Sequence, residues 1–208
     1  MSASARLPGA ISAWHCGRRP VFWLVPVGLL ARPRCLAYNP PAQMPILDEG
    51  SLEFLSHSPE QTRRLGVRLG ELLKPGDLVC LAGDLGSGKT TLAQGIARGW
   101  GCLDPVTSPT FVLVNEYRRA DLGRLYHFDA FRLSGMAEAE GIGLAELLEG
   151  EGPLLIEWPE RVAEALPPQR LWISLRWADE SRRGLHLEAN GPRYERLLRQ
   201  FRKAAFGG

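Results

Sequence analysis

The sequence has no hydrophobic run long enough to cross a membrane as a helix, and it has few cysteines. A membrane-spanning helix needs roughly 18 to 20 consecutive apolar residues, whereas the longest apolar stretch, residues 21–31, is interrupted by Pro26 and Gly28. The four cysteines form no C-x-x-C pair and no other spacing typical of a metal site. These absences argue against a membrane-spanning protein and a cysteine-based metal site. They favour reduced, structural thiols in a cytoplasmic protein.

The total charge is small, and acidic residues are missing from one part of the chain. Of 208 residues, 45% are hydrophobic and 23% are charged, and the formal net charge is +2. The composition is ordinary for a globular protein. A net charge of +2 is too small to indicate a nucleic-acid or membrane partner. Residues 1–43 contain five arginines and no acidic residue, so residues 44–208 carry a net charge of −3.

Residues 1–43 are therefore set apart from the rest of the chain. Arg18 and Arg19 precede the apolar run at 21–31, which imitates a secretory signal, but no clear cleavage site follows it. We interpret residues 1–43 as a disordered leader or as a mis-assigned translation start, with a targeting segment as the alternative. We predict a single domain over residues 44–208.

Helix and strand patterns alternate along residues 44–208. Ser58 begins a helix-start signature ahead of a stripe of leucines, and residues 78–82 are a continuous apolar run typical of a strand buried on both faces. Two segments rich in β-formers, residues 110–117 and 125–129, are joined by a short polar link that predicts an antiparallel pair. The alternation predicts an α/β domain of three layers around a mixed, mainly parallel sheet.

Residues 83–90, G-D-L-G-S-G-K-T, match the phosphate-loop pattern G-x-x-x-x-G-K-[ST] between a predicted strand and a predicted helix. Glycines let successive backbone N–H groups point inward around an anion, and the following helix adds its positive N-terminal end. Lys89 supplies a charge for the β- and γ-phosphates, and the Thr90 hydroxyl is a hard ligand suited to Mg²⁺. The motif predicts a P-loop NTPase-like domain whose loop binds a nucleotide through Gly83, Asp84, Leu85, Gly86, Ser87, Gly88, Lys89, Thr90 and Thr91.

Two acidic residues end predicted strands, where ligands of such sheets bind. Glu157 follows the apolar run 154–156 and is the better candidate for the acid that orders magnesium and its waters. Asp129 ends the second strand of the predicted antiparallel pair and is the second candidate. Each acid also has a simpler interpretation, in which it only caps the segment that follows.

Other polar and aromatic residues flank these positions. Thr110 lies in S-P-T at 108–110, where a switch-like loop could meet the γ-phosphate, although a plain turn would have the same sequence. Trp158 follows Glu157 and is interpreted as a core residue or as a lid over the nucleotide. His127 is flanked by aromatic residues, so we expect it to be packed in a strand rather than to act as a base. No N-K-x-D motif occurs, which favours ATP over GTP.

Four motifs together resemble the TsaE (YjeE) family in kind, order and spacing. They are G-D-L-G-S-G-K-T-T at 83–91, S-P-T at 108–110, H-F-D at 127–129 and I-E-W-P at 156–159. The resemblance covers residues 50–175 and begins well after residues 1–43, which have no counterpart in the family. Two departures, Ser87 and the pair Ala130-Phe131, do not involve a proposed ligand.

The resemblance implies an ATPase of tRNA N6-threonylcarbamoyladenosine synthesis that works with the TsaB and TsaD proteins and meets tRNA only indirectly. It implies that ATP and Mg²⁺ are bound, with Thr90 and Glu157 as metal-holding residues. It implies Lys89, Asp129 and Glu157 as catalytic residues, Asp129 orienting the attacking water or the metal shell. Thr110 would contact the nucleotide as a switch, and Trp158 would pack against it or cover it.

Two alternatives remain open at the level of the sequence. A small-molecule kinase could use the same loop with an arginine-bearing lid, for which Arg118, Arg119 and Arg124 are the candidates. A nucleotide-gated interaction module would bind ATP and scarcely hydrolyse it. A terminal helix is predicted from residue 192, and we expect its four arginines to form a solvated face, with contact to tRNA as the alternative.

Overall fold

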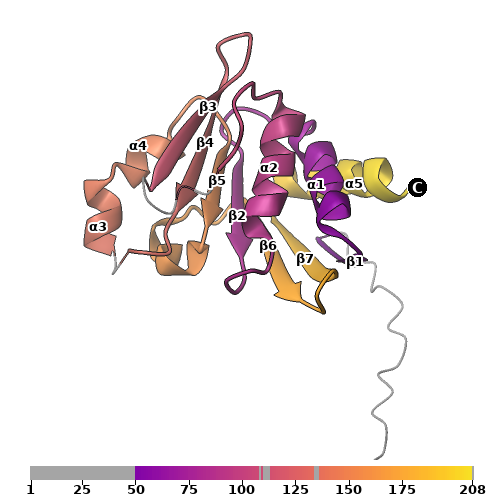
Figure 1. Ribbon diagram of the computed structural model, residues 1–208. Helices are drawn as coiled ribbons and strands as arrows, with labels where there is room; N and C mark the ends of the chain where they lie inside the picture. Colours follow the sequence, from indigo (N-terminus) through magenta and orange to yellow (C-terminus); the bar gives the residue numbers. More distant parts are fainter. Residues whose placement is uncertain (1–49, 108, 110–112, 134–135, 208) are drawn as a thin grey trace, which may run out of the picture. The chain divides into compact units, whose positions relative to one another are not determined.

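The structure is a computed structural model that describes residues 50–107, 109, 113–133 and 136–207 (Figure 1). The interpretation of residues 1–43 lies outside this range and stays a prediction. The switch role of Thr110 and the rest of the S-P-T motif apart from Pro109 lie outside it as well.

Within the described residues the chain forms one seven-stranded sheet in the order β1-β7-β6-β2-β5-β4-β3. Three pairings, β6 with β2, β2 with β5 and β5 with β4, are parallel, and the outer three are antiparallel. The sheet is therefore mixed, as predicted, with a parallel centre. The strands are β1 (Ser51–Ser56), β2 (Leu78–Ala82), β3 (Val114–Arg118), β4 (Arg124–Asp129), β5 (Leu154–Glu157), β6 (Arg170–Trp177) and β7 (Arg183–Asn190).

Helices cover both faces of this sheet, which confirms the three-layer prediction (Figure 1). One face is packed by the long helices α1 (Pro59–Gly70), α2 (Lys89–Trp100) and α5 (Pro192–Phe206). The other face is packed by the short helices α3 (Met136–Gly141) and α4 (Leu144–Leu148) and by the 3₁₀ turns η1 (Pro159–Arg161) and η2 (Ala163–Ala165).

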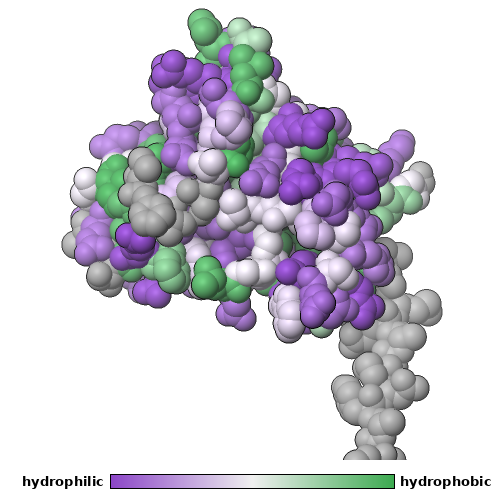
Figure 2. All heavy atoms as spheres, viewed as in Figure 1, coloured by the Kyte–Doolittle hydropathy of each residue, from purple (hydrophilic) through white to green (hydrophobic). Residues whose placement is uncertain are grey.

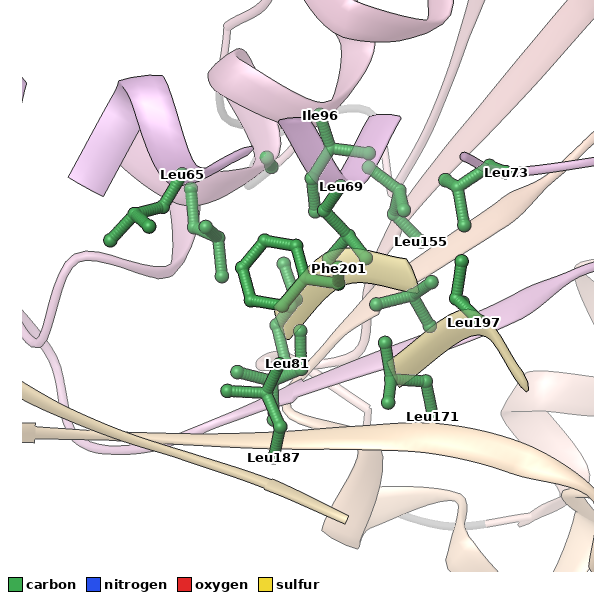
Figure 3. Close-up of a cluster of buried hydrophobic side chains, with 14 of the residues drawn as sticks. Leu65, Leu69, Leu73, Leu81, Ile96, Leu155, Leu171, Leu187, Leu197 and Phe201 are labelled. Carbon is green, nitrogen blue, oxygen red and sulfur yellow. The ribbon is translucent and has the colours of Figure 1, made fainter. Parts of the chain in front are cut away.

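The larger core lies between the long helices and the sheet. Figure 3 shows Leu69 of α1 and Phe201 of α5 meeting Leu81 of the central strand β2. Alternate residues of the strands face the other core, so Cys80 and Ile156 pack with the short helices. Period-two alternation on a sheet covered from both sides explains why β2 is apolar throughout.

Helix α1 begins with hydrogen bonds in both directions between its cap region and Gln61, and it packs very closely on α2. The Gln61 N–H donates to the Ser58 hydroxyl at 3.1 Å, and the Gln61 side chain accepts from the His57 N–H at 2.7 Å. A Cβ added at Gly70 would lie 2.0 Å from the carbonyl oxygen of Ile96, and one at Gly95 would lie 2.2 Å from that of Arg63. The glycines therefore let the two backbones touch, which fixes the position of α2.

Three features of the described residues concern the surface and the cysteines. Figure 2 shows hydrophobic side chains at the tip of the hairpin that joins β3 to β4, where Leu122 is 85% exposed. In the part of the chain that the structure describes, no helix is long and apolar enough to cross a membrane. Cys80 and Cys102 are not disulfide-bonded, and burial raises the pKa of their thiols to about 12 and about 11. Both thiols are therefore protonated at neutral pH.

Candidate nucleotide site

The loop of residues 83–88 joins β2 to α2 in a conformation that requires glycine. Gly83 has φ 136°, and a Cβ there would lie 2.2 Å from the carbonyl oxygen of Leu175. Gly88 has φ 102° and is the residue before α2, so no side chain caps the first turn of this helix. The N–H groups at the start of α2 are consequently available to an anion, and the helix dipole favours negative charge there.

The register of the parallel strands brings both predicted acids to the same edge as this loop. Glu157 of β5 pairs with Leu81 of β2 on one side and with Asp129 of β4 on the other. Paired residues of parallel strands lie level with each other, and the carboxyl ends of such strands form one edge. Glu157 and Asp129 are each only 3% exposed. Two buried carboxylates therefore lie beside the glycine-rich loop.

A cavity of about 260 Å³ opens between the loop and these acids. Its walls contain most of the residues that the sequence indicated. They are Leu85, Gly86, Gly88, Lys89, Thr90, Thr91, Asp129, Phe131, Glu157 and Trp158.

Lys89 is buried and turned toward its own loop. Its Nζ donates to the carbonyl oxygens of Gly83 at 2.6 Å and Asp84 at 2.9 Å, and it lies 3.9 Å from the centroid of the Trp158 ring. Burial lowers the pKa of Lys89, and nearby carboxylates, Glu157 first among them, oppose that shift. The ammonium group is thus held by neutral oxygens and an aromatic face, an arrangement that a phosphate can replace with a stronger partner.

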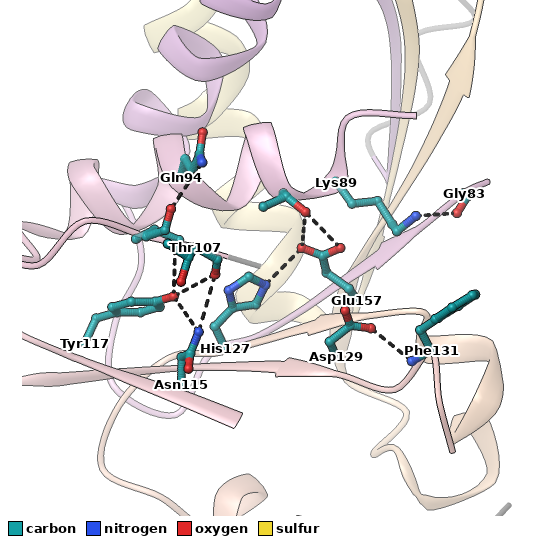
Figure 4. A network of polar contacts seen from close by, with 12 residues as sticks. Gly83, Lys89, Gln94, Thr107, Asn115, Tyr117, His127, Asp129, Phe131 and Glu157 are labelled. Carbon is teal, nitrogen blue, oxygen red and sulfur yellow. Dashed lines mark hydrogen bonds and ion pairs between the residues drawn. The ribbon is translucent and has the colours of Figure 1, made fainter. Parts of the chain in front are cut away.

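The Glu157 carboxylate at the end of β5 contacts Thr90 of helix α2 on one side and His127 of strand β4 on the other. The Thr90 hydroxyl donates to Oε1 at 3.0 Å and lies 3.3 Å from Oε2. On the other side, Nε2 of His127 lies 3.0 Å from Oε1 (Figure 4). His127 is packed in a strand, as expected, but its contact with Glu157 was not predicted. His127 and Asp129 are two residues apart in β4, so alternation places both on the face that α2 covers.

Asp129 and Trp158 shape the opposite wall. The Asp129 carboxylate accepts a hydrogen bond from the Phe131 N–H at 2.9 Å, and the rings of Phe131 and Trp158 lie 5.0 Å apart. Trp158 has φ 58°, a left-handed conformation that turns the chain from β5 into η1. Phe131 was not predicted to line the site, because nothing in its local pattern distinguishes it from an ordinary surface aromatic residue.

The other predicted loop residues, Gly83, Asp84 and Ser87, are not among the residues that line the cavity. Gly83 and Asp84 contribute the carbonyl oxygens that hold Lys89. The Ser87 side chain is 1% exposed, and its hydroxyl has no hydrogen-bond partner among the described residues. The backbone N–H of Ser87 donates to the carbonyl oxygen of Asp84 at 3.1 Å, within the loop itself.

Arg183 reaches the loop from a distant part of the sequence. It begins β7, and its Nη2 donates to the carbonyl oxygen of Gly86 at 3.3 Å. Its Nη1 donates to the carbonyl oxygens of Asp179 at 2.8 Å and Arg182 at 2.9 Å in the turn between β6 and β7. Arg183 therefore ties this turn to the outer side of the phosphate loop. Sequence reasoning missed it because only the sheet order brings the two segments together.

The arginines proposed for a lid or for tRNA are largely used by the protein itself. Arg118 and Arg124 contact Glu116, Arg119 pairs with Asp121, and none of the three lines the cavity. In α5, Arg193 pairs with Asp77 and Arg202 donates to the carbonyl oxygen of Ser51 at 2.9 Å, whereas Arg196 and Arg199 are exposed. The four arginines of α5 are thus not one uniform solvated face.

Comparison with known proteins identifies the family of the chain. Residues 56–185 match the model of the family described as "Threonylcarbamoyl adenosine biosynthesis protein TsaE". The chain belongs to the TsaE family. It contains the P-loop NTPase-like fold of TsaE proteins, and as a P-loop protein of this family it binds nucleotides.

Curated relatives and a solved structure are similar over most of their length. The TsaE protein of Bacillus subtilis is 39% identical over 149 residues, which cover 72% of this chain and 92% of that protein. The TsaE protein of Treponema pallidum is 42% identical over 127 residues, covering 60% and 91%. The crystal structure of YdiB from Bacillus subtilis matches with a TM-score of 0.63 and 34% identity, covering 74% of this chain and 95% of that one.

The residues around the cavity fit a nucleotide with Mg²⁺. A hydroxyl and two carboxylates are hard oxygen ligands, and a lysine and a free helix N-terminus suit phosphate. Among the residues that the structure describes, no group of three His, Cys, Asp or Glu side chains could hold a metal by itself. Mg²⁺ in nucleotide sites usually takes one or two protein oxygens together with phosphate oxygens and waters, so the donor set is appropriate.

Proposed function

We propose that this protein is the ATPase subunit of a bacterial system that makes N6-threonylcarbamoyladenosine in tRNA. In this proposal it hydrolyses ATP with Mg²⁺ to ADP and phosphate, and its turnover supports repeated cycles of the TsaB–TsaD complex. The observation that carries the proposal is the register that sets Glu157 and Asp129 level with each other beside Lys89 and Thr90.

Lys89 and the loop amides would bind and orient the triphosphate. Lys89 would leave the carbonyl oxygens of Gly83 and Asp84 and pair with the β- and γ-phosphates, where its charge stabilises the negative charge of the transition state. A water would attack the γ-phosphorus while the bond to the bridging oxygen breaks, and ADP would depart. Asp129 would orient this water or a water of the metal shell, and Trp158 would cover the phosphates.

Thr90 and Glu157 would hold the metal. The Thr90 hydroxyl oxygen would bind the ion through a lone pair while its O–H continues to donate to Glu157. A Mg²⁺ ion held there would supply positive charge that offsets the negative charge on the phosphates. Glu157 would accept hydrogen bonds from waters bound to the metal, which would keep the ion next to Thr90.

One structural observation favours dependence on partners. The site satisfies itself, because Lys89 is bonded to its own loop and Glu157 is bonded to Thr90 and His127. Lys89 must leave the loop oxygens before it can pair with phosphate, which opposes productive nucleotide binding, so we expect slow intrinsic turnover that TsaB and TsaD raise. A nucleotide-gated module with almost no turnover is the second candidate, favoured by the same observation. The kinase alternative is not favoured, because none of the described residues that line the cavity is an arginine.

The test is phosphate release from ATP by the full chain, with and without Mg²⁺ and with and without TsaB and TsaD. The proposal predicts Mg²⁺-dependent release without any added acceptor, raised when both partners are present. Tight nucleotide binding with no release under all four conditions would establish the gated module instead. Release that requires an added small acceptor would establish a kinase.

A further inference from the structure

His127 is the fully buried histidine of the described residues, with 0% exposure. It lies in β4 between Tyr126 and Phe128, and it does not line the nucleotide cavity. An apolar residue could fill the same space without a desolvation cost. A buried imidazole therefore needs a hydrogen-bond partner to offset the free energy lost on its desolvation.

That partner is Glu157. Nε2 of His127 lies 3.0 Å from Oε1 of Glu157, the same oxygen that accepts the Thr90 hydroxyl. Nδ1 of His127 has no hydrogen-bond partner among the described residues. A proton on Nε2 makes the bond to the carboxylate and leaves only a bare acceptor at Nδ1, which costs less than a bare N–H would. Geometry thus assigns the donor role to Nε2.

We infer that His127 is a positioning residue that orients Glu157 toward Thr90 and so sets the affinity of the site for Mg²⁺. The inference rests on the proposed function, in which Glu157 belongs to the metal shell. Figure 4 shows His127 between Glu157 and the polar group of Thr107, Asn115 and Tyr117. His127 and Thr90 contact the Glu157 carboxylate from two different elements, β4 and α2. The carboxylate therefore has one defined orientation before an ion binds.

Tyr117, whose ring packs near the imidazole of His127, is itself held by hydrogen bonds. The Tyr117 ring lies 6.3 Å from the imidazole, between centroids, and the Tyr117 hydroxyl donates to the carbonyl oxygen of Thr107 at 2.9 Å and accepts from Asn115 at 3.0 Å. The side chain of Gln94 on α2 donates to the carbonyl oxygen of Val106 at 3.1 Å. Partners of ligating carboxylates and histidines typically change metal affinity by about 10- to 100-fold when they are removed.

The experiment measures Mg²⁺ titrations of nucleotide binding by the full chain, using a fluorescent ATP analogue. His127→Leu removes the donor, and His127→Gln keeps an N–H donor of similar reach. We expect His127→Leu to raise the Mg²⁺ concentration at half-saturation on the order of tenfold, while binding measured without Mg²⁺ changes by about twofold at most. His127→Gln should restore most of the loss.

A double-mutant cycle separates positioning from packing. In a Glu157→Gln background, His127→Leu should shift the Mg²⁺ midpoint no further, because the carboxylate it acts through is gone. A thermal melt without Mg²⁺ reports the structural cost of each variant. If His127→Leu does not fold, the comparison of His127→Gln with His127→Asn, whose shorter amide does not reach Glu157, replaces it.

Three results would overturn the inference. These are an unmoved Mg²⁺ midpoint in the variant without a donor, equal shifts in the leucine and glutamine variants, or the same shift in both Glu157 backgrounds. Each of them leaves the proposed function intact as long as the unmodified chain binds the analogue in a Mg²⁺-dependent way. Loss of Mg²⁺ dependence in the unmodified chain would overturn the proposed function together with this inference.

Discussion

The two edges of the parallel strands both bury carboxylates but treat them differently. At the edge where β2 begins, Asp77 is 4% exposed and accepts from Arg193 Nε at 3.0 Å and Nη2 at 2.5 Å, and also from the Lys74 N–H at 2.7 Å. At the edge where β2 ends, Glu157 faces a hydroxyl and an imidazole, and Lys89 is bonded to carbonyl oxygens instead. One acid is matched by a cation, and the other is not.

This difference distinguishes Asp77, an acid of the structural framework, from Glu157, the acid that we propose holds the metal. The Asp77–Arg193 pair is bidentate and leaves little unsatisfied, so it connects α5 to the start of β2. Glu157 contacts a hydroxyl and an imidazole and forms no ion pair with a lysine or arginine among the described residues, so its carboxylate suits the proposed metal site. Burial alone does not reveal which acid is which. The two acids are distinguished by whether the nearest cation bonds to the carboxylate, as Arg193 does to Asp77, or to other groups, as Lys89 does.

The largest effect is expected from Lys89→Ala. Removing the only side-chain ammonium among the cavity-lining residues should lower ATP turnover by about 100-fold or more, because the transferring phosphoryl group loses its charge partner. Lys74→Ala, an exposed lysine at the opposite edge, is the matched control and should leave turnover unchanged. Phosphate release is the measurement. Equal turnover in the two variants would contradict a role for Lys89 in ATP hydrolysis that Lys74 does not share.

Arg193→Leu should have the largest effect on stability. It leaves the buried Asp77 carboxylate without its cation, and breaking a buried pair on one side costs about 3 kcal/mol. Urea unfolding followed by circular dichroism measures this loss. Nucleotide binding under native conditions should be unaffected. A stability within about 0.5 kcal/mol of the unmodified chain would show that this pair contributes no more than an ordinary surface pair.

Glu157→Gln should show the opposite pattern. The amide keeps the shape of the side chain and loses the charge that holds the metal, so we expect turnover to fall at least about tenfold with little change in the melting temperature. Paired activity and melting measurements check this. A large fall in melting temperature with activity retained would make Glu157 a structural acid like Asp77.

Arg183→Ala is expected to have the smallest effect. The loop would lose one hydrogen bond at Gly86 and its connection to the β6–β7 turn, which predicts nucleotide binding weakened by about three- to tenfold. Arg182→Ala is the control, since Arg182 pairs with Asp179 and does not contact the loop. Binding of the fluorescent analogue reports the difference. Equal affinities would show that the glycine conformations alone maintain the loop.

Local patterns predicted most elements of the fold. The apolar run at 78–82 is β2 with the same bounds, and the helix-start signature at Ser58 precedes α1, which begins at Pro59. The rule that ligands gather at the carboxyl ends of parallel strands selected Glu157 and Asp129 without knowledge of the sheet order.

Long-range features were not predictable in the same way. The bond from His127 to Glu157 depends on the register of β4 against β5, and Arg183 depends on the position of β6 next to β2. The close approach of α1 and α2 depends on glycines such as Gly70 and Gly95, whose sequence signal alone reads as weakened helix. In each case the deciding contact joins residues that are far apart in the chain.

Equilibrium dialysis of ATP with the full chain, with Mg²⁺ and with EDTA, tests the central claim most directly. The account predicts saturable binding below about 1 mM with Mg²⁺, weakened by EDTA, lost in Lys89→Ala and kept in Lys74→Ala. No retention of ATP at about 1 mM with Mg²⁺, or equal retention by both lysine variants, would contradict it.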